Sequence, residues 1–241
     1  MNKLKTILAL LLLLGTAVSV IAGAQEAGTA GAVAPAGTVT LVTGRATAVS
    51  PAGQIRNLFY GAKVYSGETL MTAGASYVNV VFSDGGRVLL RPESRFVIER
   101  YQYAGNAGAA NTNNNANEAK HESAFFRLLK GGFRAISGLI GHKQRQDYAV
   151  QTPVATIGIR GTDYEVRYCA GDCGDIQPTP RDGLYTGVQS GGIVVNNQSG
   201  EIVLSQGQFS LVPSSGAAPV PLPVRPPALG KKPLPDPRTC D

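Results

Sequence analysis

The sequence predicts an all-β fold, either a sandwich-like roll or a short β-solenoid built from many short strands. Thirty glycines and fifteen prolines among 241 residues supply many turns. Apolar residues alternate with period two in several short segments, and the glycine spacing leaves little room for long helices. Both architectures satisfy the same spacing of strands and turns, so the choice between them stays open.

The N-terminal segment 1–24 is expected to be a cleaved secretory signal. Two lysines form its basic start, and an unbroken apolar run covers 7–14. Ala-Gly-Ala at 22–24 fits the small-x-small pattern, which places cleavage before Gln25. An uncleaved membrane anchor is the alternative, but the apolar stretch is short and interrupted for a span of about 20 residues. We therefore expect a periplasmic or secreted protein with no membrane span after cleavage.

One β domain is expected over 38–212, preceded by a flexible leader over 25–37. Asp-Gly at 84–85 lies between two apolar runs and predicts a tight hairpin, because such a turn needs positive φ. Lys-Gly-Gly at 130–132 is a second hairpin candidate. An Asn-rich, low-complexity stretch over 104–119 interrupts the strand pattern and is expected to form a flexible loop.

The strands follow from alternating apolar residues. They are expected over 78–82, 88–90, 96–98, 125–129, 133–136, 148–152, 162–168, 192–195, 201–204 and 208–212. In the strand over 162–168, three apolar residues alternate with Asp163, Glu165 and Arg167. This alternation predicts one dry face and one face exposed to water.

The composition changes at Pro213. Nine of the fifteen prolines lie in the C-terminal stretch 213–241. Proline lacks the N–H that a sheet ladder needs, so this tail is expected to be extended, unpacked and disordered. A partner-docking proline motif is the alternative to a simple spacer.

Three cysteines indicate a possible disulfide in an exported chain. Cys169 and Cys173 could close a small ring, which would leave Cys240 as an odd thiol or as a pin for the tail. A zinc site needs about four nitrogen or sulfur ligands. The two histidines, His121 and His142, do not complete such a set. We expect no metal and no cofactor.

Charge and motifs argue against nucleic-acid binding and against catalysis. The net charge of +6 is spread along the chain, and no basic stripe interleaved with aromatic residues occurs, so no nucleic-acid partner is expected. The sequence contains no Gly-x-Ser-x-Gly motif. Asp84, Asp163 and Glu165 could form a carboxylate pair, but a hairpin turn and an exposed strand face explain them more simply. We expect no catalytic residues and no enzyme.

The most distinctive motif is QTPVATIGIRGTDYEV at 151–166. Its Thr-Pro step disfavours helix, and two glycines bracket Arg160, which permits sharp bends. The Arg160 guanidinium could reach a carboxylate such as Asp163 or Glu165, or it could bond main-chain carbonyls. The candidate site consists of Arg160, Gly161, Thr162 and Asp163. It is either a buried architectural pin or a recognition site for an anionic ligand or partner.

This segment resembles the hallmark of the FecR domain family, which is a Thr-Pro step, a small apolar run, Arg-Gly-Thr and an aromatic residue. Residues 67–72 and 75–85 look like the opening strands of the family. Residues 190–195 and 204–208 look like its closing strands. The resemblance implies an exported stand-alone β domain and transfers no catalytic residue.

The best-known member of that family is a periplasmic sensor for iron transport, in which a cytoplasmic anti-sigma segment and a membrane span precede the domain. Here only a signal peptide is expected before the domain. The hypothesis is therefore a binding or scaffolding module in the bacterial envelope, with an envelope protein or a glycan as partner. The alternative is a sensor or regulatory component of iron-uptake signalling that works through a separate membrane partner. The ligand and the oligomeric state stay open.

Overall fold

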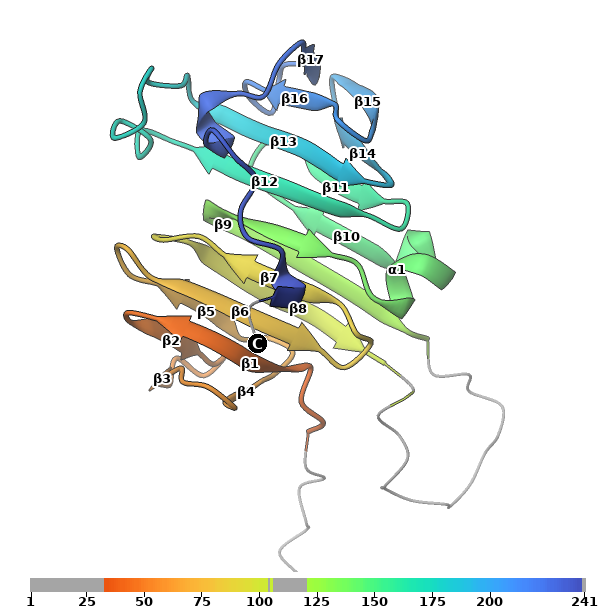
Figure 1. The fold of residues 1–241 in the computed structure, drawn as a ribbon. Coiled ribbons are helices and arrows are strands. Elements are labelled where there is room, and N and C mark those ends of the chain that lie inside the picture. The colour runs from red at the N-terminus through yellow and green to blue at the C-terminus, as the bar shows by residue number, and fades with distance from the viewer. Residues whose placement is uncertain (1–32, 104, 106–120, 240–241) are drawn as a thin grey trace, which may run out of the picture. The chain divides into compact units, whose positions relative to one another are not determined.

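The computed structural model describes residues 33–103, 105 and 121–239 (Figure 1). The expected signal peptide, most of the leader, the low-complexity loop apart from Gly105, and Cys240 lie outside the described residues. The described chain consists mostly of short strands, with one short helix, α1 (Leu139–Lys143). The 3-10 helices are η2 (Arg145–Asp147), η3 (Pro227–Leu229) and η4 (Pro237–Thr239). The predicted all-β class is confirmed.

The strands form two sheets, which we name sheet A and sheet B (Figure 1). The order in sheet A is β4 (Lys63–Val64), β1 (Gly37–Thr43), β6 (Tyr77–Phe82), β7 (Arg87–Leu90), β9 (Ser123–Ile136), β12 (Asp163–Cys169), β13 (Gly183–Ser190), β16 (Phe209–Val212) and β17 (Val220–Leu222). The order in sheet B is β3 (Ile55–Asn57), β2 (Ala46–Val49), β5 (Thr69–Thr72), β8 (Arg95–Gln102), β9, β10 (Tyr148–Gln151), β11 (Thr156–Ile159), β14 (Gly192–Asn197) and β15 (Gly200–Ser205). The chain passes repeatedly from one sheet to the other, as in a sandwich-like roll.

Strand β9 belongs to both sheets. Its first part pairs with β8 and, in parallel, with β10 in sheet B, and its last part pairs with β7 and β12 in sheet A. The strand bends at Gly131, where φ is +79° and an added Cβ would lie 2.6 Å from Ser94 Cα. Strands that change sheets use such bends to turn the corner. The predicted hairpin at 130–132 is therefore wrong, because these glycines bend one strand without reversing it.

The hairpin at 84–85 is confirmed. Strands β6 and β7 pair antiparallel with Val80 opposite Val88, and Gly85 has φ of +85° in the turn between them. The sequence did not reveal β13, which lies between β12 and β16. The first six residues of β13 are all buried, so it lacks the alternation that marks a strand with one wet face.

Aromatic rings from both sheets meet in the core. The rings of Phe82 in sheet A and Phe126 in the sheet B part of β9 have centroids 5.1 Å apart, and those of Phe133 and Tyr164 lie 5.7 Å apart. The hydroxyls of Tyr148 and Tyr164 lie 3.0 Å apart and satisfy each other by a hydrogen bond. Burial raises the pKa of both phenols. The core thus occupies the space between the two facing sheets.

Within the described ranges, none of the helices combines the length and the apolar character that crossing a bilayer requires.

Candidate functional site

The predicted Arg-Gly-Thr motif forms the corner between β11 and β12. Gly161 has φ of +64°, and an added Cβ would lie 2.9 Å from the His142 ring. The Thr162 hydroxyl donates to the Gly192 carbonyl at 2.5 Å, and the Thr162 N–H donates to Ser137 Oγ at 2.9 Å. Thr162 also accepts a hydrogen bond from the main-chain N–H of Arg160. The threonine, not the arginine side chain, therefore ties this corner to neighbouring strands.

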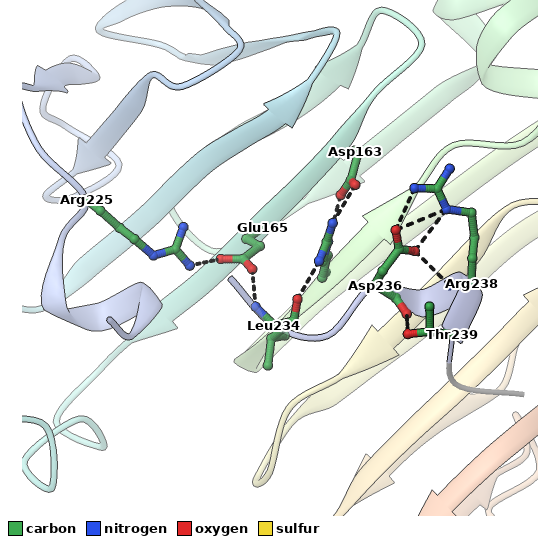
Figure 2. A network of polar contacts seen from close by, with 8 residues as sticks. Asp163, Glu165, Arg225, Leu234, Asp236, Arg238 and Thr239 are labelled. Carbon is green, nitrogen blue, oxygen red and sulfur yellow. Dashed lines mark hydrogen bonds and ion pairs between the residues drawn. The ribbon is translucent and has the colours of Figure 1, made fainter. Parts of the chain in front are cut away.

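The expectation that Arg160 is a buried pin is wrong. Arg160 is exposed, and its guanidinium makes no hydrogen bond or ion pair with any residue in the described part of the chain. The carboxylates proposed as its partners are held by other arginines. Asp163 pairs with Arg134, and Glu165 pairs with Arg225 (Figure 2). The corner turns Arg160 outward, because Gly161 adopts a left-handed conformation just before β12 begins.

The buried pin is the pair of Arg134 on β9 and Asp163 on β12. Two hydrogen bonds of 2.8 and 2.7 Å join the guanidinium to both carboxylate oxygens, and both side chains are about nine-tenths buried. These bonds raise the pKa of Arg134. A third donor of the guanidinium reaches the main-chain carbonyl of Leu234. A charged residue in the otherwise apolar run 133–136 was the sequence signal for this buried pair.

Glu165 is fully buried, so the predicted wet face of β12 is not wet. Its carboxylate accepts hydrogen bonds from the Arg225 guanidinium and from the main-chain N–H of Leu234 (Figure 2). Arg91 lies 3.8 Å from the same carboxylate. Burial lowers the pKa of Arg91 to about 10, although Glu165 acts in the opposite direction. Residues near the C-terminus therefore cover the polar face of this strand.

The C-terminal tail is packed, contrary to the expectation of a disordered tail. We name residues 225–239 the strap. It crosses the outer face of sheet A from η3 to η4, over β12, β9 and β7 (Figure 1). Proline carries no N–H, so an extended proline-rich segment can be buried with few main-chain donors left to satisfy. The missing N–H of proline, which argued against a sheet strand here, therefore permits the tail to pack as an extended segment.

Side chains of sheet A hold the main chain of the strap. Asn79 Nδ2 donates to the Pro237 carbonyl at 2.9 Å, and Arg91 donates to the Leu229 carbonyl at 2.9 Å. Leu234 is buried and forms an apolar anchor between two exposed prolines. Within the strap, hydrogen bonds from Arg238 lower the pKa of Asp236 to about 2. The strap is thus recognised chiefly through its backbone carbonyls and one N–H.

The disulfide ring supports the start of the strap. Cys169 and Cys173 are joined by a disulfide. Both cysteines are buried in a cluster with Tyr185 and with Ala228 and Leu229 of the strap. The ring therefore forms part of the apolar floor on which η3 packs.

The other candidate groups named from the sequence have structural partners. The Asp84 carboxylate accepts hydrogen bonds from the main-chain N–H groups of Gly86 and Ile140. His121 lies 3.5 Å from Asp147. His142 borders a cavity of about 120 Å³ that Gly161, Thr162, Asp163 and Arg238 also line. Among the described residues, no group of three or more His, Cys, Asp or Glu side chains is placed to hold a metal ion.

An open groove, which we name the Tyr60 groove, lies on sheet A where β4, β1, β6 and β7 run side by side. Its volume is about 570 Å³. Its walls come from β1, β4, β6, β7 and the turns before β4 and after β6, and include Thr38, Tyr60, Lys63, Ser83 and Arg87. The Tyr60 side chain is 73% exposed. The sequence did not indicate this site, because an exposed tyrosine in a short turn carries no signal of its neighbours.

Leu58, which is 5% exposed, anchors the turn that presents Tyr60. Lys63 Nζ donates to the Thr38 hydroxyl at 2.8 Å across the groove wall. The Arg87 guanidinium donates to the Pro237 carbonyl at 3.2 Å, so the end of the strap borders the groove. The groove therefore combines an exposed aromatic ring, two cations and several hydroxyls.

The comparisons with known proteins agree with the motif. Residues 68–174 match the model of the family described as FecR protein. Among curated proteins there is no significant match to this sequence. Two crystal structures, at 2.50 and 1.65 Å resolution, of a protein described as a "putative anti-sigma factor" from Parabacteroides distasonis are similar to the chain, with 13% identity and TM-scores of 0.47 and 0.46. The alignments cover 67% of this chain and 61% of the solved chains.

A third structure, described as a cell surface anchoring domain, has 34% identity over 26% of this chain and 82% of its own, with a TM-score of 0.25. The chain spans about three fifths of the length of the two anti-sigma-factor structures, at 61%. The family match covers the Arg-Gly-Thr corner, the Arg134–Asp163 pair and the disulfide. Residues 68–174 of this chain are a FecR domain.

Proposed function

We propose that this chain is a non-catalytic binding module of the bacterial envelope, exported from the cytosol, with the Tyr60 groove as its ligand site. The observation that carries the proposal is the grouping of an exposed aromatic ring with Lys63 and Arg87 in an open groove. The volume of about 570 Å³ lies within the range of about 300–1,000 Å³ that is common for ligand sites.

The groove chemistry favours a glycan that carries carboxylates. An exposed tyrosine ring offers an apolar face for stacking and a hydroxyl for hydrogen bonding. Lys63 and Arg87 supply charge for anionic groups, and the Thr38 and Ser83 hydroxyls suit sugar hydroxyls. Such polymers are abundant in an envelope, which agrees with the expected export of the chain.

The buried carboxylates support binding over catalysis. Asp163 and Glu165 are each held by an arginine, and Asp84 accepts main-chain hydrogen bonds. A general acid or base needs a carboxyl that can reach a substrate. These three groups stabilise the fold instead, which supports a binding role for the chain over a catalytic one.

Co-sedimentation with purified peptidoglycan sacculi tests the proposal. Wild-type protein should sediment with the sacculi, and the variant Tyr60→Ala with Lys63→Ala should lose at least about 10-fold in affinity, because stacking and charge are both removed. Val203→Ala, on the exposed edge strand β15, is the matched control and should bind as wild type does. Absence of wild-type binding, or binding that ignores the groove substitutions, would reject the glycan ligand.

The same variants distinguish the glycan-binding proposal from the alternative, a sensor or regulator in iron-uptake signalling. Immobilised wild type and the Tyr60→Ala, Lys63→Ala variant are exposed to detergent-solubilised envelope proteins. Recovery of one transporter or sensor by the wild type alone would favour that alternative over the glycan. Mass spectrometry of the mature protein checks export, since cleavage before Gln25 is expected.

A further inference from the structure

The outer face of sheet A holds the strap as a binding protein holds a peptide. Both main-chain polar groups of Leu234 are bound: its N–H donates to Glu165 (Figure 2), and its carbonyl accepts from Arg134. The Leu234 side chain is buried between two exposed prolines. One side-chain anchor and paired main-chain contacts are the means by which grooves bind extended peptides.

Within the strap, a short exposed link joins η3 to residues 234–239. Gly230, with φ of +80°, is followed by Lys231, Lys232 and Pro233, which are all exposed. Residues 234–239 then dock through Leu234 and Pro237 without pairing to any strand. Release of residues 234–239 would break no strand pairing among the described strands. This segment can therefore detach from sheet A without unfolding either sheet.

The groups that hold the strap form a prepared surface. The Arg134–Asp163 pair fixes the guanidinium within the sheet, and Asn79 projects from β6 toward the Pro237 carbonyl. Because these groups bind main-chain atoms, they do not demand the sequence of the strap. They demand an extended segment with few N–H groups to satisfy, which is a property of proline-rich peptides.

We propose that the outer face of sheet A is a recognition groove for an extended proline-rich peptide with a leucine between prolines, and that the strap occupies it until a partner segment of this chemistry replaces it. The partner is a protein segment that carries Pro-Leu-Pro, as the strap does at 233–235. This groove is distinct from the Tyr60 groove, although Arg87 contributes to both.

A labelled synthetic peptide with the sequence of residues 230–239 tests the proposal on the full chain. The variant Leu234→Asp places a charge at the buried anchor beside Glu165 and should release the strap. The peptide should bind this variant and bind wild type at least 10-fold more weakly, because the strap of the wild type already fills the groove. A control peptide with aspartate in place of leucine should not bind the variant.

Glu165→Gln added to Leu234→Asp should weaken peptide binding by at least 10-fold, whereas Tyr60→Ala should leave it unchanged. Failure of the peptide to bind the folded Leu234→Asp variant would overturn the proposal, as would equal binding to wild type. Leu234→Ala, which shortens the anchor without adding charge, replaces Leu234→Asp if circular dichroism shows that the latter does not fold. Dimers of the wild type in gel filtration, with no peptide binding to the variant, would indicate strap exchange between copies and reject a foreign peptide. The Tyr60→Ala result keeps this test independent of the glycan proposal.

Discussion

The carboxylate of Glu165 accepts a hydrogen bond from the main-chain N–H of Leu234, which lies 69 positions further along the chain. This contact joins the middle of sheet A to the C-terminal strap. It also explains why a carboxylate is fully buried on a strand face that the sequence indicated to be wet. A buried charge is tolerated only where partners replace its lost water, and the strap supplies Arg225 and this N–H for that purpose.

The Arg134–Asp163 pair should be costly to break from one side only. Arg134→Met leaves the buried Asp163 carboxylate without its two hydrogen bonds, so the free energy of unfolding should fall by about 3–5 kcal/mol. Replacing both residues, as Arg134→Met with Asp163→Leu, should cost less than the single change, because no buried charge is left unpaired. Chemical denaturation of both variants measures the difference. A loss below about 1 kcal/mol for Arg134→Met would argue against a buried pin.

The bend in β9 should depend on Gly131. Gly131→Ala adds a Cβ at positive φ and within 2.6 Å of Ser94 Cα, so the free energy of unfolding should fall by more than about 2 kcal/mol. Gly158→Ala in β11 is the matched control, since an added Cβ there meets nothing within 4 Å. Thermal unfolding of both variants gives the comparison. Equal melting temperatures would contradict the account of the bend.

At the Arg-Gly-Thr corner the threonine should matter more than the arginine. Thr162→Val removes the hydroxyl that donates to the Gly192 carbonyl, which keeps its hydrogen bond from the Arg160 main-chain N–H, so the cost should be about 0.5–1.5 kcal/mol. Arg160→Ala changes an exposed side chain and should stay within about 0.5 kcal/mol of wild type. Urea unfolding midpoints of the two variants decide the order. The reverse order would restore Arg160 as the residue that holds the corner.

Alkaline pH should unfold the protein through its buried tyrosines. Burial raises the pKa of Tyr101, Tyr148 and Tyr164 above the usual value of about 10. These tyrosines have higher pKa values in the folded than in the unfolded protein. Their contribution to the free energy of unfolding is therefore complete below about pH 10 and is lost as the pH rises above it. Circular dichroism and tyrosinate absorbance, followed together, should change in one transition. Ionisation of these phenols in a still folded protein would contradict the buried Tyr148–Tyr164 contact.

The sequence predicted what depends on local pattern. The Asp-Gly hairpin, the strands around it and the all-β class follow from period-two alternation and turn chemistry, and the structure has them. The Lys-Gly-Gly segment was misread because glycine permits both a reversal and a bend. Which one occurs is decided by the pairing of β9 with strands far away in the sequence.

The candidate site was only partly predictable for the same reason. Asp163 and Glu165 were recognised as a polar strand face, but their partners lie on β9 and on the strap. A proline-rich tail has no hydrophobic periodicity that indicates packing, so its contacts with Asn79 and Arg91 could not be predicted from the sequence. Tyr60 and Lys63 lie near Arg87 only because β1 pairs with both β4 and β6, and β6 pairs with β7.

Hydrogen exchange at the Leu234 amide tests most directly whether sheet A holds the strap by its main chain. In the full-length protein this amide donates to the buried Glu165 carboxylate, so it should exchange at least about 10-fold more slowly than the amides of the exposed Lys231 and Lys232. Glu165→Gln should reduce that protection while the core strands stay protected. Exchange of the Leu234 amide at the rate of an unstructured peptide would contradict the account.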